Sequence, residues 1–147
     1  MTTFKFRLGA VLKYREGVMD ECNRKLKELQ FERTRLISQG DQLEQRRNAI
    51  ESDSRSQELK SGSDLRALSA FQLSCRKAIA ELAVRIHDVD LQIATQSKLA
   101  MESKREFRLM EKLRLLQHDK WKKERDVEIE ANAADSYLSK WNREGNF

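Results

Sequence analysis

The sequence predicts an all-α protein in which two long helices form an antiparallel coiled-coil hairpin. Proline is absent from the 147 residues, and Ala, Glu, Lys, Arg and Leu make up about half of the chain, which is typical of long helices. Apolar residues recur at intervals of three and four, and one serine-rich segment interrupts them. Charged residues account for 36% of the chain. A rod with a narrow apolar seam leaves these charges in water, whereas a compact globule would bury many of them unfavourably.

The first helix is predicted over residues about 4–56. One line of apolar residues repeats at seven-residue steps: Cys22, Leu29, Leu36, Leu43 and Ile50. This period winds paired helices into a left-handed supercoil. The neighbouring line changes from apolar to polar or small residues: Met19, Leu26, Arg33, Gly40 and Arg47. We expect such a segment to be loosely held or to share this face with a partner. Gly40 is either tolerated in the helix or makes the helix more flexible where the partner docks.

A turn is predicted at about 57–63, where loop-forming residues cluster, and the second helix at about 64–141. Ser61 with Asp64 three residues later fits the N-cap of the second helix. The apolar residues after the turn again follow helical spacing: Leu65, Leu68, Cys75, Ile79, Leu82, Ile86, Val89 and Ile93. Beyond them the apolar residues spread over a wider face: Leu99, Phe107, Leu109, Met110, Leu113, Leu116 and Trp121. We treat residues 1–147 as one domain.

The two cysteines lie on different predicted helices and at different heights. With a turn near residue 60, Cys22 faces about residue 98, so its sulfur lies roughly 35 Å along the axis from that of Cys75. This separation excludes an intramolecular disulfide. No apolar run approaches the roughly 20 residues that span a bilayer, and no signal-peptide core is present. We therefore expect a cytoplasmic protein without direct membrane insertion.

The sequence contains no recognisable constellation for catalysis, for a cofactor or for a metal. His87 and His118 lie far apart on the same predicted helix, and no Cys-x-x-Cys pair suggests zinc. No glycine-rich phosphate loop occurs, and a helical surface without a concavity lacks the shaped pocket that catalysis needs. We therefore expect a protein that is not an enzyme and that acts by binding other proteins.

Aromatic residues near the turn and near the end of the second helix are candidate partner contacts. Close to the turn, we expect Phe71 or Leu73 to point partly outward from the seam. This side chain either packs locally at the hairpin tip or offers an exposed contact to a partner. Near the other end lie Trp121, Tyr137 and Trp141. Trp and Tyr are favoured as interface anchors, although these residues could equally cap the end of the coiled coil.

The opening of the chain follows the pattern Phe-x-Phe-x-Leu-x-x-Val-Leu-x-x-Arg, with these residues: Phe4, Phe6, Leu8, Val11, Leu12 and Arg15. This pattern resembles the start of the FliJ family. The stretches 102–113, 121–125 and 128–135 resemble the C-terminal half of the family. FliJ is a small coiled-coil component of the flagellar type III protein export apparatus. The resemblance therefore implies a role in flagellum biogenesis, motility and chemotaxis, with a cytoplasmic location at the membrane-bound export apparatus.

The resemblance also implies the partners of the chain. FliJ proteins resemble the central stalk of rotary ATPases and are expected to bind the export ATPase hexamer, the cytoplasmic region of the export-gate membrane protein, and export chaperones. For the ATPase ring, the expected contacts lie at the paired helix ends: Phe6, Leu8, Leu12, Arg15, Lys122, Lys123 and Arg125. For the gate, they lie on the polar line and near Phe71: Leu43, Arg47, Ile50, Leu68, Phe71 and Cys75.

Three alternative functions remain open from the sequence. An injectisome stalk would use the same mechanics in a different machine. A structural spacer would self-dimerise through its heptads and form no hairpin, which the break at 52–64 argues against. A basic nucleic-acid-binding helix fits the net charge of +5, but the dispersed acidic residues argue against it because nucleic-acid binders concentrate positive charge on one stripe.

Overall fold

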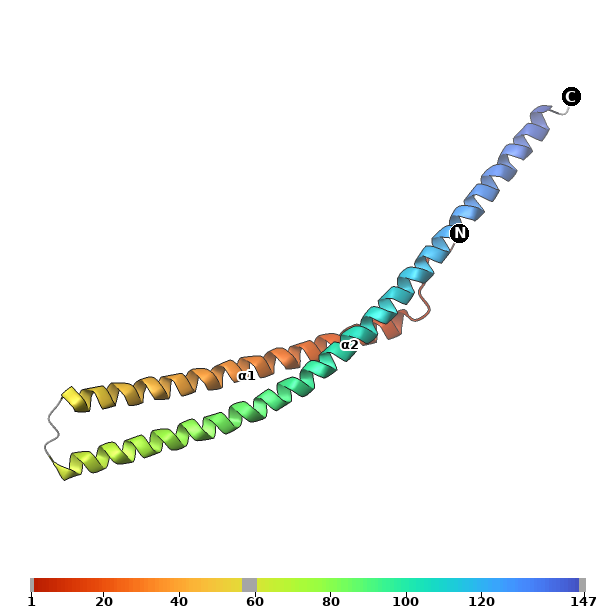
Figure 1. The fold of residues 1–147 in the computed structure, drawn as a ribbon. Coiled ribbons are helices and arrows are strands. Elements are labelled where there is room, and N and C mark those ends of the chain that lie inside the picture. Colours follow the sequence, from red (N-terminus) through yellow and green to blue (C-terminus); the bar gives the residue numbers. More distant parts are fainter. Residues whose placement is uncertain (1, 57–60, 146–147) are drawn as a thin grey trace. The chain divides into compact units, whose positions relative to one another are not determined.

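The computed structural model of the chain describes residues 2–56 and 61–145. Its regular elements are two helices, α1 Gly9–Ser56 and α2 Gly62–Gly145, and no strand occurs among the described residues (Figure 1). The two helices pack against each other, which confirms the predicted all-α helical hairpin. No proline interrupts either helix, so every turn can keep its backbone hydrogen bonds.

The chain divides into two compact units, which we describe separately. The hairpin unit is Asp20–Met101, and the terminal unit comprises the described parts of Met1–Met19 and Glu102–Phe147. Each unit contains one stretch of α1 and one stretch of α2. The organisation of the chain as a single domain stays a prediction.

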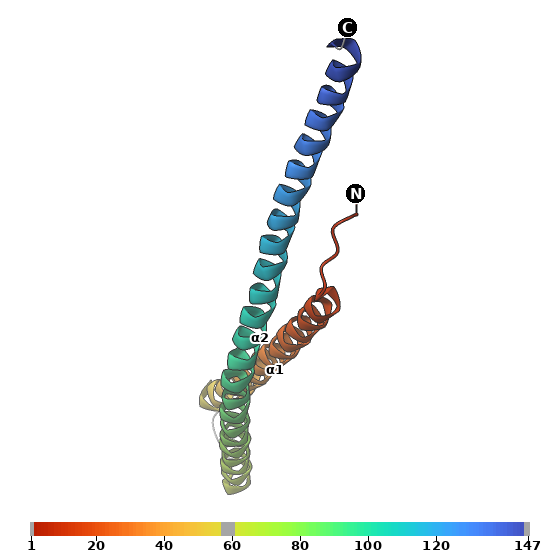
Figure 2. The same cartoon turned by 90° about the vertical axis from the view of Figure 1, so that its right-hand side faces the viewer.

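In the hairpin unit, α1 and α2 run side by side in opposite directions (Figures 1 and 2). The amide nitrogen of Gln72 donates a hydrogen bond of 3.0 Å to the Glu51 carboxylate near the turn. At the other end, the Gln96 amide donates one of 3.1 Å to the carbonyl of Cys22. Cys22 thus lies opposite a residue only two positions from the expected residue 98. Both cysteines are free thiols.

A narrow seam between α1 and α2 forms the core of the hairpin unit. Its most buried members are Leu36, Cys75, Leu82 and Ala100, with 2–8% of their surface exposed. Leu36, Cys75 and Leu82 belong to the predicted stripes. Their burial stabilises the fold by about 25 cal/mol for each Å² of apolar surface that is removed from water. Leu65 was expected in the same stripe but is 52% exposed, because it lies in the first turn of α2, before the seam begins at Leu68.

The seam of α2 is narrower beyond Ile93 than the sequence predicted. Leu99, Leu109 and Leu116 are 47–59% exposed. The covered positions keep the seven-residue register instead, and several are small or polar: Gln96 and Ala100 in the hairpin unit, and Ser103, Phe107 and Met110 in the terminal unit. Register and not hydropathy decides which residues face α1, and a second neighbour helix against the wider apolar face stays a prediction.

The start of α2 follows the predicted capping chemistry. The hydroxyl of Ser61 accepts a hydrogen bond of 3.2 Å from the backbone N–H of Asp64, which satisfies a donor that has no partner within the helix. Gly62 is already the first residue of α2. Of the predicted turn, residues 57–60 lie outside the described residues.

The start of α1 differs from the prediction, since the helix begins at Gly9 and not near residue 4. A turn precedes it, in which the N–H of Gly9 donates to the carbonyl of Phe6 at 3.0 Å. Residues 2–6 have no helical structure. Within the terminal unit, Phe4 packs against rings of α2, and this contact explains why the chain leaves the helical path.

We predict that Gly40→Ala stabilises the protein by about 1 kcal/mol, because alanine is the better helix former. A methyl group at Gly40 meets no other side chain within 4 Å, and the glycine does not have a positive φ. Urea unfolding followed by circular dichroism measures the change. Gly17→Ala, which has equally open space, is the matched control. A loss of stability at Gly40 alone would contradict the prediction.

Candidate partner-binding surfaces

Neither a metal site nor a membrane span is found in the described part of the chain. No three His, Cys, Asp or Glu side chains come together within residues 2–56 and 61–145. Neither α1 nor α2 contains an apolar stretch long enough to cross a bilayer.

The six residues assigned to the export gate all lie in the hairpin unit and all lie along its seam. Cys75 is 5% exposed, and the other five are half-buried: Leu43, Arg47, Ile50, Leu68 and Phe71. A partner can reach the five half-buried side chains at the edge where the two helices meet, whereas Cys75 is covered. Whether they bind the gate stays a prediction.

A groove of about 490 Å³ opens between α1 and α2 beside Leu43. Residues of both helices line it: Gln39, Gln42, Leu43, Arg46, Ala78, Glu81, Leu82 and Arg85. The apolar floor of the groove comes from Leu43, Ala78 and Leu82, and the remaining residues form a polar and charged rim. A groove with an apolar floor and a charged rim suits an amphipathic segment of another protein.

One gate residue carries an unsatisfied hydrogen-bond donor. The Nε atom of Arg47 is buried and has no acceptor within the described residues. A buried donor without a partner costs roughly 1–3 kcal/mol. An acceptor brought by another molecule would remove this penalty.

Charged pairs lie on the surface of the hairpin unit, one between its two helices and others within α1. Arg33 Nε donates to the carboxylate of Asp90 across the seam at 2.5 Å. On α1, the Arg35 guanidinium makes two hydrogen bonds to Glu32, of 2.9 and 2.6 Å. These bonds lower the pKa of Glu32 and raise that of Arg35 from their ordinary values. Such exposed pairs contribute little stability individually.

The N-terminal residues assigned to the ATPase ring lie in the terminal unit. Phe6, Leu12 and Arg15 are half-buried, and Leu8 is 37% exposed. Arg15 forms an ion pair with Glu106 of α2. This pair joins α1 to α2 within the unit, so part of the assigned set already serves the packing of the terminal unit.

An aromatic cluster lies where the N-terminal segment meets α2 in the terminal unit. The ring of Phe4 stands edge-on to His118 at 5.0 Å and lies 5.8 Å from Trp121. The Arg125 guanidinium lies over the Trp121 ring, 5.1 Å from its centroid. Aromatic pairs contribute about 0.5–1.5 kcal/mol beyond area burial, and the cation–π contact adds a comparable amount. Together these contacts hold the N-terminal segment on α2.

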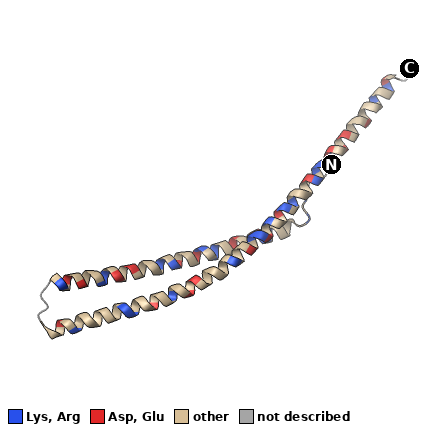
Figure 3. Cartoon of the chain, viewed as in Figure 1, with Lys and Arg blue, Asp and Glu red and all other residues tan. Residues whose placement is uncertain are grey.

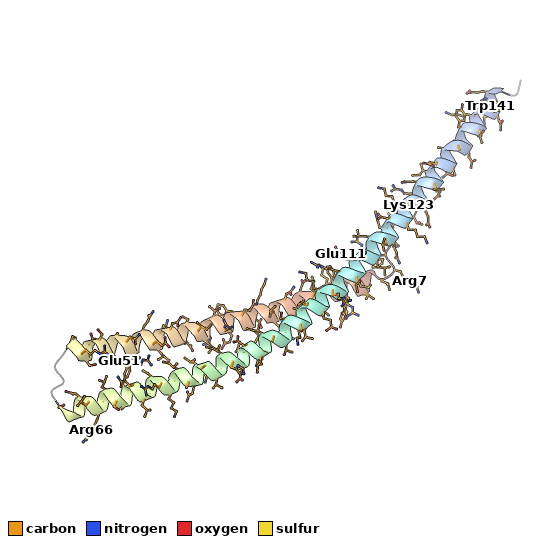
Figure 4. The ribbon with its side chains drawn as sticks, in the orientation of Figure 1. Arg7, Glu51, Arg66, Glu111, Lys123 and Trp141 are labelled. Carbon is orange, nitrogen blue, oxygen red and sulfur yellow. The ribbon has the colours of Figure 1, made fainter. Side chains whose placement is uncertain are left out.

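Beyond Trp121, α2 is largely open to solvent. Lys122 and Lys123 are exposed, and Lys123 projects from α2 in Figure 4. All residues of 126–145 are exposed as well, including Tyr137 and Trp141 at 70% and 62%. No side chain of the described residues covers this stretch, and it offers a bare helical surface.

Sequence reasoning placed Trp121 among the interface anchors but missed its contacts. Phe4 and His118 were not assigned to any site, whereas His118 is half-buried against Phe4. A register derived from the turn near residue 60 pairs residue 4 with about residue 116, and this signal could have revealed the cluster. The two outer aromatic residues, Tyr137 and Trp141, remain candidate anchors.

We predict that Phe4→Ala exposes Trp121. In a Trp141→Phe background Trp121 is the only tryptophan, so its fluorescence reports on the cluster. The emission should shift to longer wavelength, and acrylamide should quench it more strongly. Phe31→Ala, which removes a 73% exposed ring in the hairpin unit, should change neither signal. Unchanged quenching in the Phe4 variant would show that the cluster does not persist in solution.

Comparison with known proteins identifies the family. No curated protein and no solved structure is significantly similar to the chain. A family model described as flagellar FliJ protein matches residues 4–143. The match covers both helices and includes the N-terminal segment with Phe4. The chain therefore belongs to the FliJ family of flagellar proteins.

Proposed function

We propose that this chain is a non-enzymatic stalk that binds the export ATPase hexamer through its terminal unit and the export gate through its hairpin unit. Its family makes it a component of the flagellar export apparatus, which favours the flagellar system over an injectisome. In this proposal the chain promotes assembly of the ATPase and couples it to secretion, while export chaperones bind elsewhere on the coiled coil. It works in the cytoplasm, at the membrane-bound apparatus.

The exposed basic pair Lys122 and Lys123 on α2 is the observation that carries the ATPase proposal. Lys122 and Lys123 extend into solvent next to the aromatic cluster, and the bare helix of residues 126–145 follows them. A rod held inside a ring of subunits needs complementary charge and moderate apolar contact, and not a deep pocket. The terminal unit offers this combination of features.

We predict that Lys122→Glu with Lys123→Glu lowers the affinity for the cognate export ATPase at least tenfold, because both changes reverse the positive charge that the proposal matches with acidic groups of the ring. The ATPase rate and the fraction of ATPase hexamers are measured as the concentration of the chain is increased, which gives two curves. Lys25→Glu with Lys27→Glu changes the same charge on exposed positions of the hairpin unit and should leave both curves unchanged. If the wild-type chain neither stimulates nor assembles the ATPase, the stalk proposal fails.

The groove beside Leu43 supports binding of the gate to the hairpin unit. Its rim carries Arg46 and Arg85, one from each helix, so an acidic amphipathic segment would meet both guanidinium groups above an apolar floor. The buried Nε of Arg47 lies in the same region of α1 and lacks an acceptor among the described residues. An acidic partner would supply acceptors to these groups.

We predict that Arg46→Glu with Arg85→Glu weakens binding of the cytoplasmic region of the gate at least tenfold while ATPase stimulation is retained. Binding is measured by calorimetry. Arg24→Glu with Arg35→Glu, at exposed positions on α1, is the control for charge alone. Equal losses in both variants would mean that the groove has no specific role in gate binding.

The self-dimerising spacer is less well supported than the stalk. That alternative requires a chain whose seam is free to pair with a second copy. In the hairpin unit the seam residues Leu36, Cys75 and Leu82 are already covered within one chain. If the spacer alternative is wrong, we expect the free protein to sediment as a monomer.

A further inference from the structure

The end of α2 carries an apolar stripe that no described residue covers. We call it the terminal stripe, and it consists of Val127, Ala131, Ala134, Leu138 and Trp141. These residues repeat at steps of four and three, which is the spacing of a coiled-coil seam, and the large ones are 53–65% exposed. The indole of Trp141, near the end of α2 in Figure 4, lies 3.8 Å from the place that a Cβ would take at Gly145. Single exposed apolar residues are normal, whereas a contiguous apolar patch marks an interaction surface.

The terminal stripe is not a continuation of the seam within the terminal unit. The half-buried positions of α2 run to His118, Trp121 and Arg125 at steps of three and four. The same spacing beyond Arg125 gives only polar residues: Glu128, Asn132, Asp135, Ser139 and Asn142. The apolar residues stand one position earlier, which places them about 100° around the helix axis. The terminal stripe is therefore a second face of α2, which does not serve its packing with the N-terminal part of the chain.

The charges beside the terminal stripe are all negative. In heptad order, the positions that flank the stripe on its two sides hold these side chains: Glu128, Glu130, Asp135, Tyr137, Asn142 and Glu144. The basic residues of the same stretch, Lys140 and Arg143, lie about 130° and 180° from the centre of the stripe, given 3.5 residues per turn. None of the ion pairs among the described residues involves Glu128, Glu130 or Asp135. A helix that packs on the stripe therefore meets carboxylates at both of its margins.

Acidic margins disfavour a membrane, a nucleic acid and a second copy as the occupant. Anionic membranes and nucleic acids attract surfaces that carry Lys or Arg. A second copy brings the same margins, so that Glu130 would face Asp135 in a parallel pair, and Glu128 would face Asp135 in an antiparallel pair. Lys123 also lies at a flanking position, but it precedes Val127 by one turn and can offset only the contacts at that end. The occupant is therefore a helix of another protein.

We propose that the terminal stripe is the docking face for an amphipathic helix of a partner protein that carries Lys or Arg at both margins of its apolar seam. Charge complementarity determines the margins of that helix. The small side chains of Ala131 and Ala134 leave room at the centre of the contact for a large apolar residue such as Leu. With Gly145 the stripe spans residues 127–145, so the contact is about 28 Å long.

This inference goes beyond the proposed function and does not rest on it. Residues 104–125, which include Lys122 and Lys123, contain nine basic and four acidic residues, whereas residues 126–145 contain two basic and five acidic ones. The proposed ATPase contact therefore calls for acidic groups on the partner, and the terminal stripe calls for basic groups. The two surfaces are adjacent along α2 and have opposite charge.

The first test follows Trp141 in the full chain. In a Trp121→Phe background Trp141 is the only tryptophan, so its emission reports binding at the stripe and not elsewhere. Two synthetic three-heptad peptides without tryptophan carry Leu at their seam positions, and one has Lys and the other Glu at the flanking positions. At about 0.15 M salt, where distant charges are screened, the Lys peptide should shift the emission to shorter wavelength and bind at least tenfold tighter than the Glu peptide. The net charge of +5 on the chain opposes this preference, so general electrostatic attraction does not produce it.

The second test removes the apolar surface. Val127→Asp with Leu138→Asp should abolish binding of the Lys peptide. Ile129→Asp with Ser136→Asp adds the same charge to the opposite face of α2, where both residues are exposed, and should leave the binding in place. Circular dichroism verifies that each variant keeps its helices. Binding that survives the Val127 and Leu138 changes would contradict the proposal.

The third test reverses the margins and keeps the apolar residues. Changing Glu128, Glu130 and Asp135 together to Lys should invert the preference, so that the Glu peptide binds at least tenfold tighter than the Lys peptide. Lys140→Glu with Arg143→Glu alters charges away from the stripe and should leave the preference for the Lys peptide unchanged. Equal binding of both peptides by the wild-type margins would overturn the proposal.

Two other outcomes identify a different occupant and would also overturn the proposal. One is a self-dimer in sedimentation that the Val127 and Leu138 changes dissociate. The other is a shift of the Trp141 emission on vesicles of anionic lipid in the absence of peptide. Neither the ATPase nor the gate is present in these experiments, so their failure leaves the stalk proposal untouched, and a failure of ATPase stimulation leaves this inference untouched.

Discussion

The seam between α1 and α2 is the constraint on which the rest of the structure depends. Most helical stability in proteins comes from packing an apolar face against another element, and not from the intrinsic propensity of the helix. Here that packing is only about two side chains wide, and Leu36, Cys75, Leu82 and Ala100 are the most buried residues of the hairpin unit. The placement of these few positions along the two helices decides which faces of α1 and α2 stay exposed in the hairpin unit.

A seam this narrow leaves most side chains in contact with solvent, so recognition has to occur on helix surfaces. α1 and α2 of the hairpin unit use their surfaces differently. The outer face of α1 is densely charged, and ion pairs such as that between Arg35 and Glu32 cover it. Residues 65–101 of α2 contain 8 charged residues, whereas residues 20–56 of α1 contain 16, and Figure 3 shows this part of α2 as largely uncharged.

The sequence was sufficient for the features that local chemistry determines. The seven-residue line through Leu36 predicted the seam, and Ser61 predicted the start of α2, because heptad spacing and capping depend only on neighbours along the chain. The path of the seam beyond Ile93 was not predictable from hydropathy, since Gln96 and Ser103 face α1 while Leu99 and Leu109 face solvent. Residues that are small or polar enter a seam when the register brings them there, and this register is a property of both helices together.

The N-terminal segment shows why the candidate site was harder to predict than the fold. Its apolar residues fit a helical stripe as well as an extended segment, and only the contact of Phe4 with His118 and Trp121 decides between them. An extended chain advances about 3.3 Å per residue and a helix 1.5 Å, so a few residues cover several turns of α2. The cover reaches Arg125, and every described residue beyond it is exposed. The boundary between the covered and the bare part of α2 is therefore set by aromatic contacts far apart in the sequence, and the basic residues proposed to meet the ATPase lie at this boundary.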